Sequence, residues 1–282
     1  MGKWQKNISE TKRQKMSNKM DPTFCIITPT AYLDDFASQS SMHLVLAHLV
    51  DTDSKYEGFY YSRDEFKIMD NGAFELGESY NPDKLIELGQ RCRADAIVLP
   101  DYPLKDAQVT VNAANEYIGD VKSAGFKTMF VPQSETDDLE GWIRAYEYAA
   151  NHPDIDIIGM SILGIPNAIS HIHTAFARVV LTELLIDRGI FNFEKPHHYL
   201  GLNSGPSLEI PSLLNSGALT SCDSSGPVWA GILGHEYSYN TDSLQSVSKI
   251  KAHVDFDYPL VANEQTLDRI QRNIDMTLEL FD

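Results

Sequence analysis

Acidic and amide side chains end several of the short hydrophobic runs in this chain. Asp70 follows KIM, Asp101 follows IVLP, Gln133 follows MFVP, and Asp223 follows ALTSC. Two carboxyl groups in one pocket repel each other, so one is protonated more readily while the other stays ionised. Such a pair can act as a general acid/base and a carboxylate nucleophile. A single Asp also starts turns and caps helices, so it is their joint position at the ends of the runs that favours a site.

The runs alternate with longer amphipathic segments. We expect strands at 24–29, 66–70, 95–101, 127–133, 156–162, 197–203 and 218–223, with DYPLVAN (257–263) as the candidate for an eighth. Apolar spacing of three and four residues predicts helices at 81–93, 110–125, 139–152, 169–189 and 207–215, with Gly125 and Gly189 as C-caps. Strands that alternate with helices form a parallel sheet, because each connection must return over the sheet. We therefore predict an α/β fold, a (β/α)8 TIM-type barrel, with an open doubly wound sheet as the alternative.

In such a barrel the carboxyl ends of the strands form one face, and active sites lie there. The residues predicted to reach that face are Asp70, Asp101, Gln133, Gly159, Ser161, Asn203 and Asp223. Around Asp70 the sequence MDNGAF is also typical of a hairpin, because Asn-Gly after a hydrophobic run favours a tight turn. We interpret this segment as a site first and a turn second, with Asn71-Gly72 bending the chain so that Asp70 faces the pocket.

Six short motifs, in order along the chain, resemble the tRNA-guanine transglycosylase family. DNGAFE (70–75) resembles the DSGGFQ motif of that family, IVLPD (97–101) its guanine-recognition strand, VPQSE (131–135) its VQGG segment, and IIGMSILG (157–164) its IGGLAVGE strand. HYLGLNSGPSLEIPSLLNSG (198–217) is similar to YLMGVGxPxDLLxxVxxG, and the following ALTSCDSSGP is similar to DxFDCVxPTR. The resemblance covers about residues 24–231, and the shared order makes it specific although each motif is loose.

The resemblance implies base exchange at a guanine nucleoside through a covalent aspartyl intermediate. It implies that Asp223 is the nucleophile, that Asp70 is the general acid/base, and that Asp101 binds the Watson–Crick edge of guanine. The other candidates for substrate binding are Gln133, Gly159, Ser161, Asn203, Phe74 and Tyr102. Phe74 and Tyr102 flank two of the aspartates, where they either sandwich the base or simply pack at the mouth of the barrel.

Parts of the family pattern are absent from this sequence. The CxCxxC zinc site and its distant His are missing, and SSGPVW replaces the basic PTR stretch. The zinc-less pattern looks most like the phage-type branch that inserts 7-deazaguanine derivatives, of the queuosine and archaeosine precursor type, into DNA. We therefore expect a transferase of DNA modification, a pentosyl-type glycosyltransferase that binds DNA and a free 7-deazaguanine base without a cofactor or metal. The alternatives are a tRNA-guanine transglycosylase, a deazaguanine nucleoside hydrolase and a non-catalytic purine-binding sensor.

The charge is unevenly distributed. Forty Asp and Glu against 23 Lys and Arg give a formal net charge of −17, which argues against a broad phosphate-binding surface. Lysines and arginines crowd residues 1–20, which we expect to form a disordered basic arm, with nucleic-acid contact as the minority alternative. Residues 21–282 are expected to form a single barrel domain. A homodimer or a partner protein that supplies a nucleic-acid groove stays open.

The scattered cysteines indicate a reducing, intracellular compartment, so we expect a cytoplasmic protein, in the host cytoplasm if the gene is carried by a phage. Cys25, Cys92 and Cys222 form no CxxC pair, so neither a disulfide framework nor a structural zinc site is supported. No apolar run approaches the roughly 20 residues that cross a bilayer, so no membrane partner is expected. The pairs His171/His173 and His197/His198 lack a third ligand at metal spacing, which favours surface or packing histidines.

Overall fold

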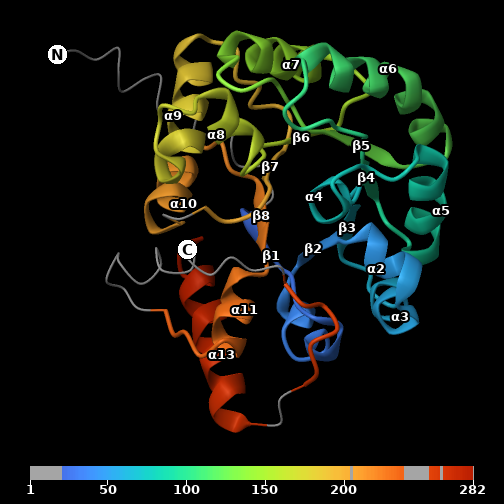
Figure 1. Ribbon diagram of the computed structural model, residues 1–282, viewed down its shortest axis with the longest axis vertical. Helices are drawn as coiled ribbons and strands as arrows, with labels where there is room; N and C mark the ends of the chain where they lie inside the picture. Colours follow the sequence, from blue (N-terminus) through green and yellow to red (C-terminus); the bar gives the residue numbers. More distant parts are fainter. Residues whose placement is uncertain (1–20, 204–205, 238–253, 261–262, 282) are drawn as a thin grey trace.

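Eight parallel strands form a nearly closed barrel in the computed structural model, which describes residues 21–203, 206–237, 254–260 and 263–281 (Figure 1). The strands are β1 (Thr23–Ile26), β2 (Met42–Val45), β3 (Phe66–Met69), β4 (Ala96–Val98), β5 (Lys127–Phe130), β6 (Ile157–Gly159), β7 (His197–Tyr199) and β8 (Ser221–Ser224). Their order in the sheet is β1-β8-β7-β6-β5-β4-β3-β2, and β1 and β2 lie beside each other at its two ends. The fold is therefore α/β, a (β/α)8 TIM-type barrel, as the alternation of segments predicts.

Helices surround the strands on the outside of the barrel, except for α4 (Ala73–Leu76), which lies within the ring in this view (Figure 1). They are α2 (Ala47–Thr52), α3 (Ser54–Tyr61), α4 (Ala73–Leu76), α5 (Pro82–Cys92), α6 (Ala107–Ser123), α7 (Leu139–Asn151), α8 (Gly164–Ala168), α9 (Thr174–Asp187), α10 (Pro206–Asn215), α11 (Gly226–Ile232) and α13 (Glu264–Leu278). The five predicted helices correspond to α5, α6, α7, α9 and α10. Gly125 and Gly189 adopt positive φ values of 93° and 71° just after α6 and α9, which confirms them as the residues that end these helices.

The eighth strand is β2, and the prediction of a strand at 257–263 is wrong for the part that the structure describes. Residues 254–260 form a turn and irregular chain, while 261–262 lie outside the described residues. This segment lies against the connection that follows β1, where the backbone N–H of Thr30 donates to the carbonyl of Phe256 at 3.0 Å. The MHLV run of β2 escapes sequence reasoning because one residue separates it from α2, so its apolar residues merge with the helical pattern of LAHLV.

Short 3-10 turns, instead of an α-helix, connect β1 to β2. They are η2 (Thr30–Tyr32) and η3 (Ala37–Gln39). Beyond them the hydroxyl of Ser40 accepts a hydrogen bond from the backbone N–H of Ile26 at 2.9 Å. This bond satisfies a strand amide at the seam between β1 and β2, where the sheet has no ladder pairing. A side chain thus replaces one ladder bond in closing the barrel.

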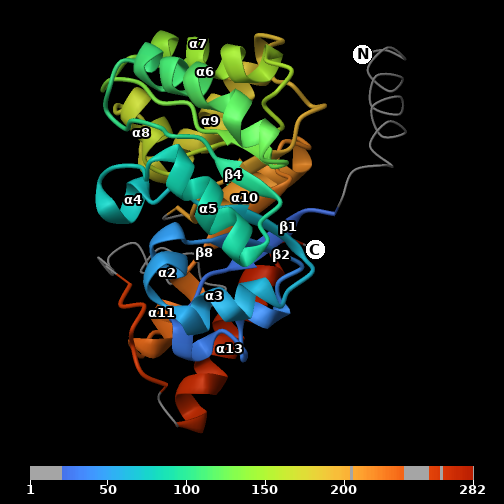
Figure 2. The same cartoon turned by 90° about the vertical axis from the view of Figure 1, so that its right-hand side faces the viewer.

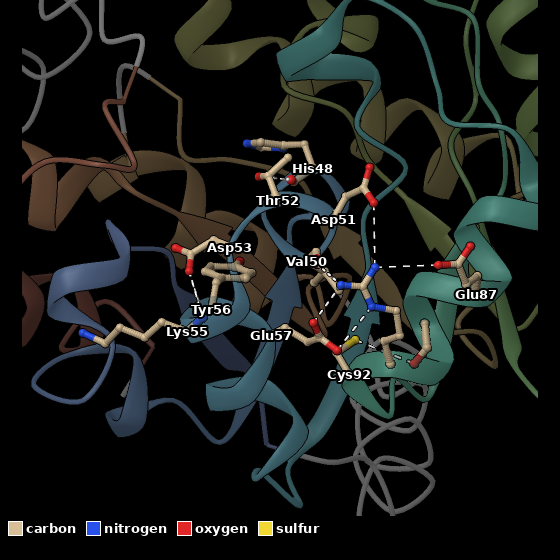
Figure 3. A network of polar contacts seen from close by, with 12 residues as sticks. His48, Val50, Asp51, Thr52, Asp53, Lys55, Tyr56, Glu57, Glu87 and Cys92 are labelled. Atoms are coloured by element: carbon tan, nitrogen blue, oxygen red, sulfur yellow. Dashed lines mark hydrogen bonds and ion pairs between the residues drawn. The ribbon is translucent and has the colours of Figure 1, made fainter.

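An ion-pair network fastens α2 and α3 to α5, which lie side by side in both views (Figures 1 and 2). The guanidinium of Arg91 on α5 donates to Glu57 at 2.7 Å and to the carbonyl of Val50 at 2.8 Å. Asp51 and Glu87 face the same guanidinium from α2 and α5 (Figure 3). These side chains are between 27% and 55% exposed, so we interpret the cluster as a support for the helices around β2 and β3.

The basic segment 1–20 lies outside the described residues, so its predicted disorder stays a prediction. Among the helices that the structure describes, none has both the length and the apolar character of a bilayer-spanning segment.

Candidate active site at the carboxyl end of the barrel

The register of the strands decides which side chains point into the barrel. On β7, Tyr199 bonds Thr182 of α9 and His197 bonds Tyr146 of α7, so these two side chains face the outer helices. Alternation along a strand then turns His198 inward. His198 is paired in register with Ser221, and Asp223 lies two residues further along β8, so both face the interior as well. Asp223 therefore projects from the carboxyl end of β8 into the mouth of the barrel.

Asp70 is held just beyond the end of β3. Its backbone N–H continues the ladder by donating to the carbonyl of Val45 at 2.8 Å. Its carboxylate Oδ2 accepts from the backbone N–H of Gly72 at 3.0 Å, and Gly72 takes the left-handed φ of 80° that glycine tolerates best. The chain then enters α4 instead of a second antiparallel strand. The segment is therefore a turn that leads into a helix, with a half-buried Asp70 at its first position.

Asp101, beyond β4, is the centre of a buried amide–carboxylate cluster. The side-chain amide of Asn71 donates to Asp101 Oδ1 at 2.6 Å, and the amide of Gln133 donates to Asp101 Oδ2 at 2.6 Å. Asn71 also donates to the carbonyl of Leu99 at 3.0 Å, which fixes the plane of its amide. Asp101 is only 6% exposed. Residues that follow three neighbouring strands, β3, β4 and β5, therefore converge on one carboxyl group.

Burial and hydrogen bonding act on the Asp101 carboxyl in opposite directions. Desolvation raises its pKa above the ordinary value, and the two amide donors partly offset that rise because they stabilise the charged form. Each carboxylate oxygen retains lone-pair capacity for a further donor. Gln133 adds an acceptor, because its buried Oε1 has no hydrogen-bond partner among the described residues. The cluster therefore contains oxygen acceptors with capacity for further N–H donors.

A glycine packs closely against the amide of Gln133 in this cluster. A Cβ atom on Gly164, the first residue of α8, would lie 2.5 Å from Oε1 of Gln133. The hydroxyl of Ser161 accepts from the backbone N–H of Gly164 at 3.0 Å and from that of Leu163 at 3.2 Å, which holds the start of α8 in place. The turn after β6 is thus shaped around the amide of Gln133.

The Asp223 carboxylate is held by two groups from β7 and the turn that follows it. Its Oδ1 lies 3.1 Å from Nε2 of His198 and accepts from the backbone N–H of Gly201 at 3.0 Å. Nδ1 of His198 in turn lies 2.7 Å from the hydroxyl oxygen of Ser221. The Asp223 side chain is 7% exposed, whereas the His198 side chain is completely buried. One oxygen of the carboxylate is thereby fixed.

A buried ion pair supports the turn that contains Gly201. The guanidinium of Arg178 on α9 makes two bonds of 2.6 Å to Glu209 on α10, and both side chains are at most 1% exposed. The same guanidinium donates to the carbonyls of Met160, Leu200 and Gly201 at 3.2, 2.8 and 2.7 Å. Arg178 thus connects the ends of β6 and β7 to the outer helices and sets the backbone that bonds Asp223.

The other predicted substrate-binding residues lie at this end of the barrel in varied settings. Gly159 ends β6, where a Cβ would lie 2.8 Å from Val131, so close packing alone accounts for its glycine. The amide of Asn203 donates to the carbonyl of Ala175 at 3.1 Å, toward the start of α9. Phe74 on α4 is 70% exposed and Tyr102 beside Asp101 is 39% exposed, so both aromatic rings stand open to solvent.

Sequence reasoning missed two residues that hold the site aspartates, namely Asn71 at Asp101 and His198 at Asp223. Asn71 was interpreted only as part of a turn, yet its amide bonds Asp101 30 positions away. His198 is buried, which agrees with the packing alternative for this histidine, but its contact with Asp223 is not predicted. Cys222 of β8 is fully buried, and burial raises the pKa of its thiol well above the ordinary value. Nothing in the local pattern marks Asn71 or His198, because their partners are distant in the chain.

Neither models of known protein families nor the curated proteins include a match to this chain. Within the part of the chain that the structure describes, His, Cys, Asp and Glu side chains nowhere gather in groups of three that could hold a metal ion.

Proposed function

We propose that the protein exchanges guanine in DNA for a 7-deazaguanine base through a covalent aspartyl–nucleoside intermediate. The observation that carries the proposal is the clamped carboxyl of Asp101, with the acceptor Oε1 of Gln133 beside it. Guanine offers adjacent N–H groups at N1 and at its 2-amino group, which suit a set of acceptors. The resemblance of six motifs to the transglycosylase family supports the same assignment.

The order of the strands favours a nucleotide that lies across the mouth of the barrel. Asp101 and Gln133 follow the adjacent strands β4 and β5, whereas Asp223 belongs to β8, which lies opposite β4 in the ring. A base held at β4 and β5 would extend its glycosidic bond toward β8. Asp70 follows β3, on the side of the base site. Recognition and nucleophilic attack therefore fall to separate walls of one mouth.

Two displacements with balanced proton transfers make up the proposed reaction. An oxygen of Asp223 forms a bond to the anomeric carbon as the bond from that carbon to guanine N9 breaks and its electron pair stays on N9. The protonated Asp70 carboxyl gives its proton to the departing guanine, which leaves neutral. The incoming base then attacks the same carbon, returns its ring N–H proton to Asp70 and releases Asp223. Two inversions retain the configuration, as in retaining glycosidases.

DNA is proposed as the polymer because the zinc site and the basic stretch of the tRNA-acting relatives are absent from this sequence. A guanine in a duplex must leave the stack before it can reach the site, at a cost of a few kcal/mol. The exposed rings of Phe74 and Tyr102 offer stacking surfaces for the displaced base or its neighbours.

Incorporation of radiolabelled guanine tests the proposal. Wild type, Asp223→Ala and Asp70→Ala are each given single-stranded DNA, duplex DNA and unmodified tRNA. The proposal expects label in DNA with the wild type alone. Label that enters tRNA alone would show that tRNA, and not DNA, is the polymer substrate. A folded protein that binds guanine and labels neither polymer contradicts base exchange; release of free base from a nucleoside would then indicate the hydrolase, and binding without turnover the sensor.

A further inference from the structure

Two buried side chains that the predicted site does not include, His198 and Ser221, extend from Asp223 into the interior of the barrel. Ser221 and Asp223 project inward from β8 two residues apart, and His198 projects inward from β7 at the level of Ser221. Its ring spans the two, with Nδ1 at 2.7 Å from the serine oxygen and Nε2 at 3.1 Å from Asp223 Oδ1. Ser221 is 3% exposed and lies on the inner side of the imidazole, so its hydroxyl is not available to a substrate.

We propose that His198 is a positioning residue that holds Asp223 Oδ1 and leaves Oδ2 as the attacking atom. This inference rests on the proposed function. The described residues give Oδ1 two donors, His198 Nε2–H and the backbone N–H of Gly201, and they give Oδ2 none. A carboxylate fixed through one oxygen cannot rotate its second oxygen away from the substrate without breaking both bonds. Preorganisation of this kind lowers the cost of reaching the reactive geometry.

The Asp223 carboxylate sets which ring nitrogen carries the proton, and the Ser221 hydroxyl can match that choice on the other side of the ring. An ionised carboxylate accepts hydrogen bonds and cannot donate them, so Nε2 must bear the hydrogen that faces Asp223. Nδ1 of a neutral imidazole is then an acceptor, and the Ser221 hydroxyl is the donor that faces it. All three groups are satisfied by a neutral ring with a hydrogen on Nε2. In the opposite tautomer, two acceptors would face each other at the Asp223 end.

The surrounding residues leave this arrangement undisturbed. Cys25 on β1 is in register with Asp223 and is fully buried. Burial raises the pKa of its thiol well above the ordinary value, and the charge of Asp223 raises it further, so the thiol stays neutral. Ladder pairing holds β7 beside β8 on one side and beside β6 on the other. The imidazole therefore projects from a strand that is held on both sides, which suits it to hold Asp223 in place.

Exchange of radiolabelled guanine into guanine-containing DNA tests the role of His198. His198→Leu removes the donor at similar volume, while His198→Gln keeps an N–H group that can reach Oδ1. Loss of a hydrogen bond to a charged group predicts a kcat about 10- to 100-fold lower in His198→Leu. Binding of free guanine should stay within about twofold, because the base site at Asp101 lies across the mouth; His198→Gln should recover most of the rate.

His197→Leu is the matched control, because it removes a buried histidine from the same strand but from the face that packs on Tyr146. His197→Leu should lower the free energy of unfolding but should not show the fall in kcat that we expect for His198→Leu. Wild-type kcat in His198→Leu, or equal losses of kcat in both leucine variants, would overturn the proposal. So would a His198→Gln variant that folds but is as slow as His198→Leu.

A spectroscopic measurement tests the arrangement even if the wild type exchanges no base. In full-length protein labelled with 15N-histidine, His198 should show a protonated, pyrrole-like Nε2 and an unprotonated, pyridine-like Nδ1. Ser221→Ala should weaken that preference. A hydrogen on Nδ1 and none on Nε2 would overturn the inference whatever the catalytic result. If His198 shows the expected tautomer but the protein exchanges no base, the result would count against the proposed function alone.

Discussion

Breaking the buried Arg178–Glu209 pair should destabilise the fold far more than breaking an ion pair of the same chemistry on the surface. Glu209→Gln removes the negative charge and leaves the guanidinium buried, since both side chains are at most 1% exposed. Removal of one partner from a buried pair costs about 3–5 kcal/mol, because the remaining charge has lost its compensation. Gln keeps the size of the side chain, so the loss reports charge more than packing.

Arg272 and Glu236 offer a matched control within the same chain. They also make two bonds, of 3.0 and 3.1 Å, but their side chains are 49% and 50% exposed. Glu236→Gln should therefore change the free energy of unfolding by less than about 1 kcal/mol.

Urea unfolding followed by circular dichroism measures both variants against the wild type. Glu209→Gln should lower the midpoint by about 1 M or more, given a urea dependence of roughly 3 kcal/mol per M for a chain of this size. Glu236→Gln should leave the midpoint almost unchanged. Equal effects of the two substitutions, or a Glu209→Gln variant within 1 kcal/mol of the wild type, would refute the view that Arg178 is a buried charge that depends on Glu209.

Three further changes probe the site and the core. Asp101→Asn should weaken binding of free guanine about 10- to 100-fold in calorimetry, because the new amide repels a donor where the carboxylate accepts one; unchanged affinity would remove Asp101 from base recognition. Gly164→Ala should displace the amide of Gln133 and weaken guanine binding, whereas Gly119→Ala, which has nothing within 4 Å of its Cβ, should stabilise α6 by roughly 0.5–1 kcal/mol. Burial lowers the pKa of His43 from 6.5 to about 4, so below pH 6.5 the unfolded chain binds a proton that the native histidine rejects, and stability should fall by roughly 3 kcal/mol between pH 6.5 and 4. His43→Leu should lose that part of the pH dependence in unfolding midpoints; an unaltered pH profile would contradict it.

The barrel could be predicted because each buried strand is short, apolar and followed by a helical pattern. Asp70, Asp101, Gln133 and Asp223 could be placed at its mouth because the carboxyl ends of parallel strands share one face. The strand β2 could not be found, since its four residues run almost directly into α2 and have no polar boundary on their C-terminal side. Local patterns determine elements only where such boundaries exist.

Contacts between distant residues explain the rest of what sequence reasoning missed. The bond from Asn71 to Asp101 joins residues 30 positions apart, and the contact of His198 with Asp223 spans 25. Both depend on the register between strands, which no single segment encodes. The hairpin interpretation of Asn71-Gly72 fails for a related reason, because the turn geometry is compatible with either a second strand or a helix, and the parallel sheet selects the helix.

Capture of the covalent intermediate tests the central claim most directly. Wild-type protein is mixed with a guanine-containing oligonucleotide in the absence of any incoming base, quenched in denaturant and analysed by denaturing electrophoresis and peptide mass spectrometry. We predict a protein–DNA adduct on the peptide that contains Asp223, released when guanine is added before the quench and absent in Asp223→Asn. An adduct on another residue, or labelled guanine entering DNA at the wild-type rate in Asp223→Asn, would contradict the account.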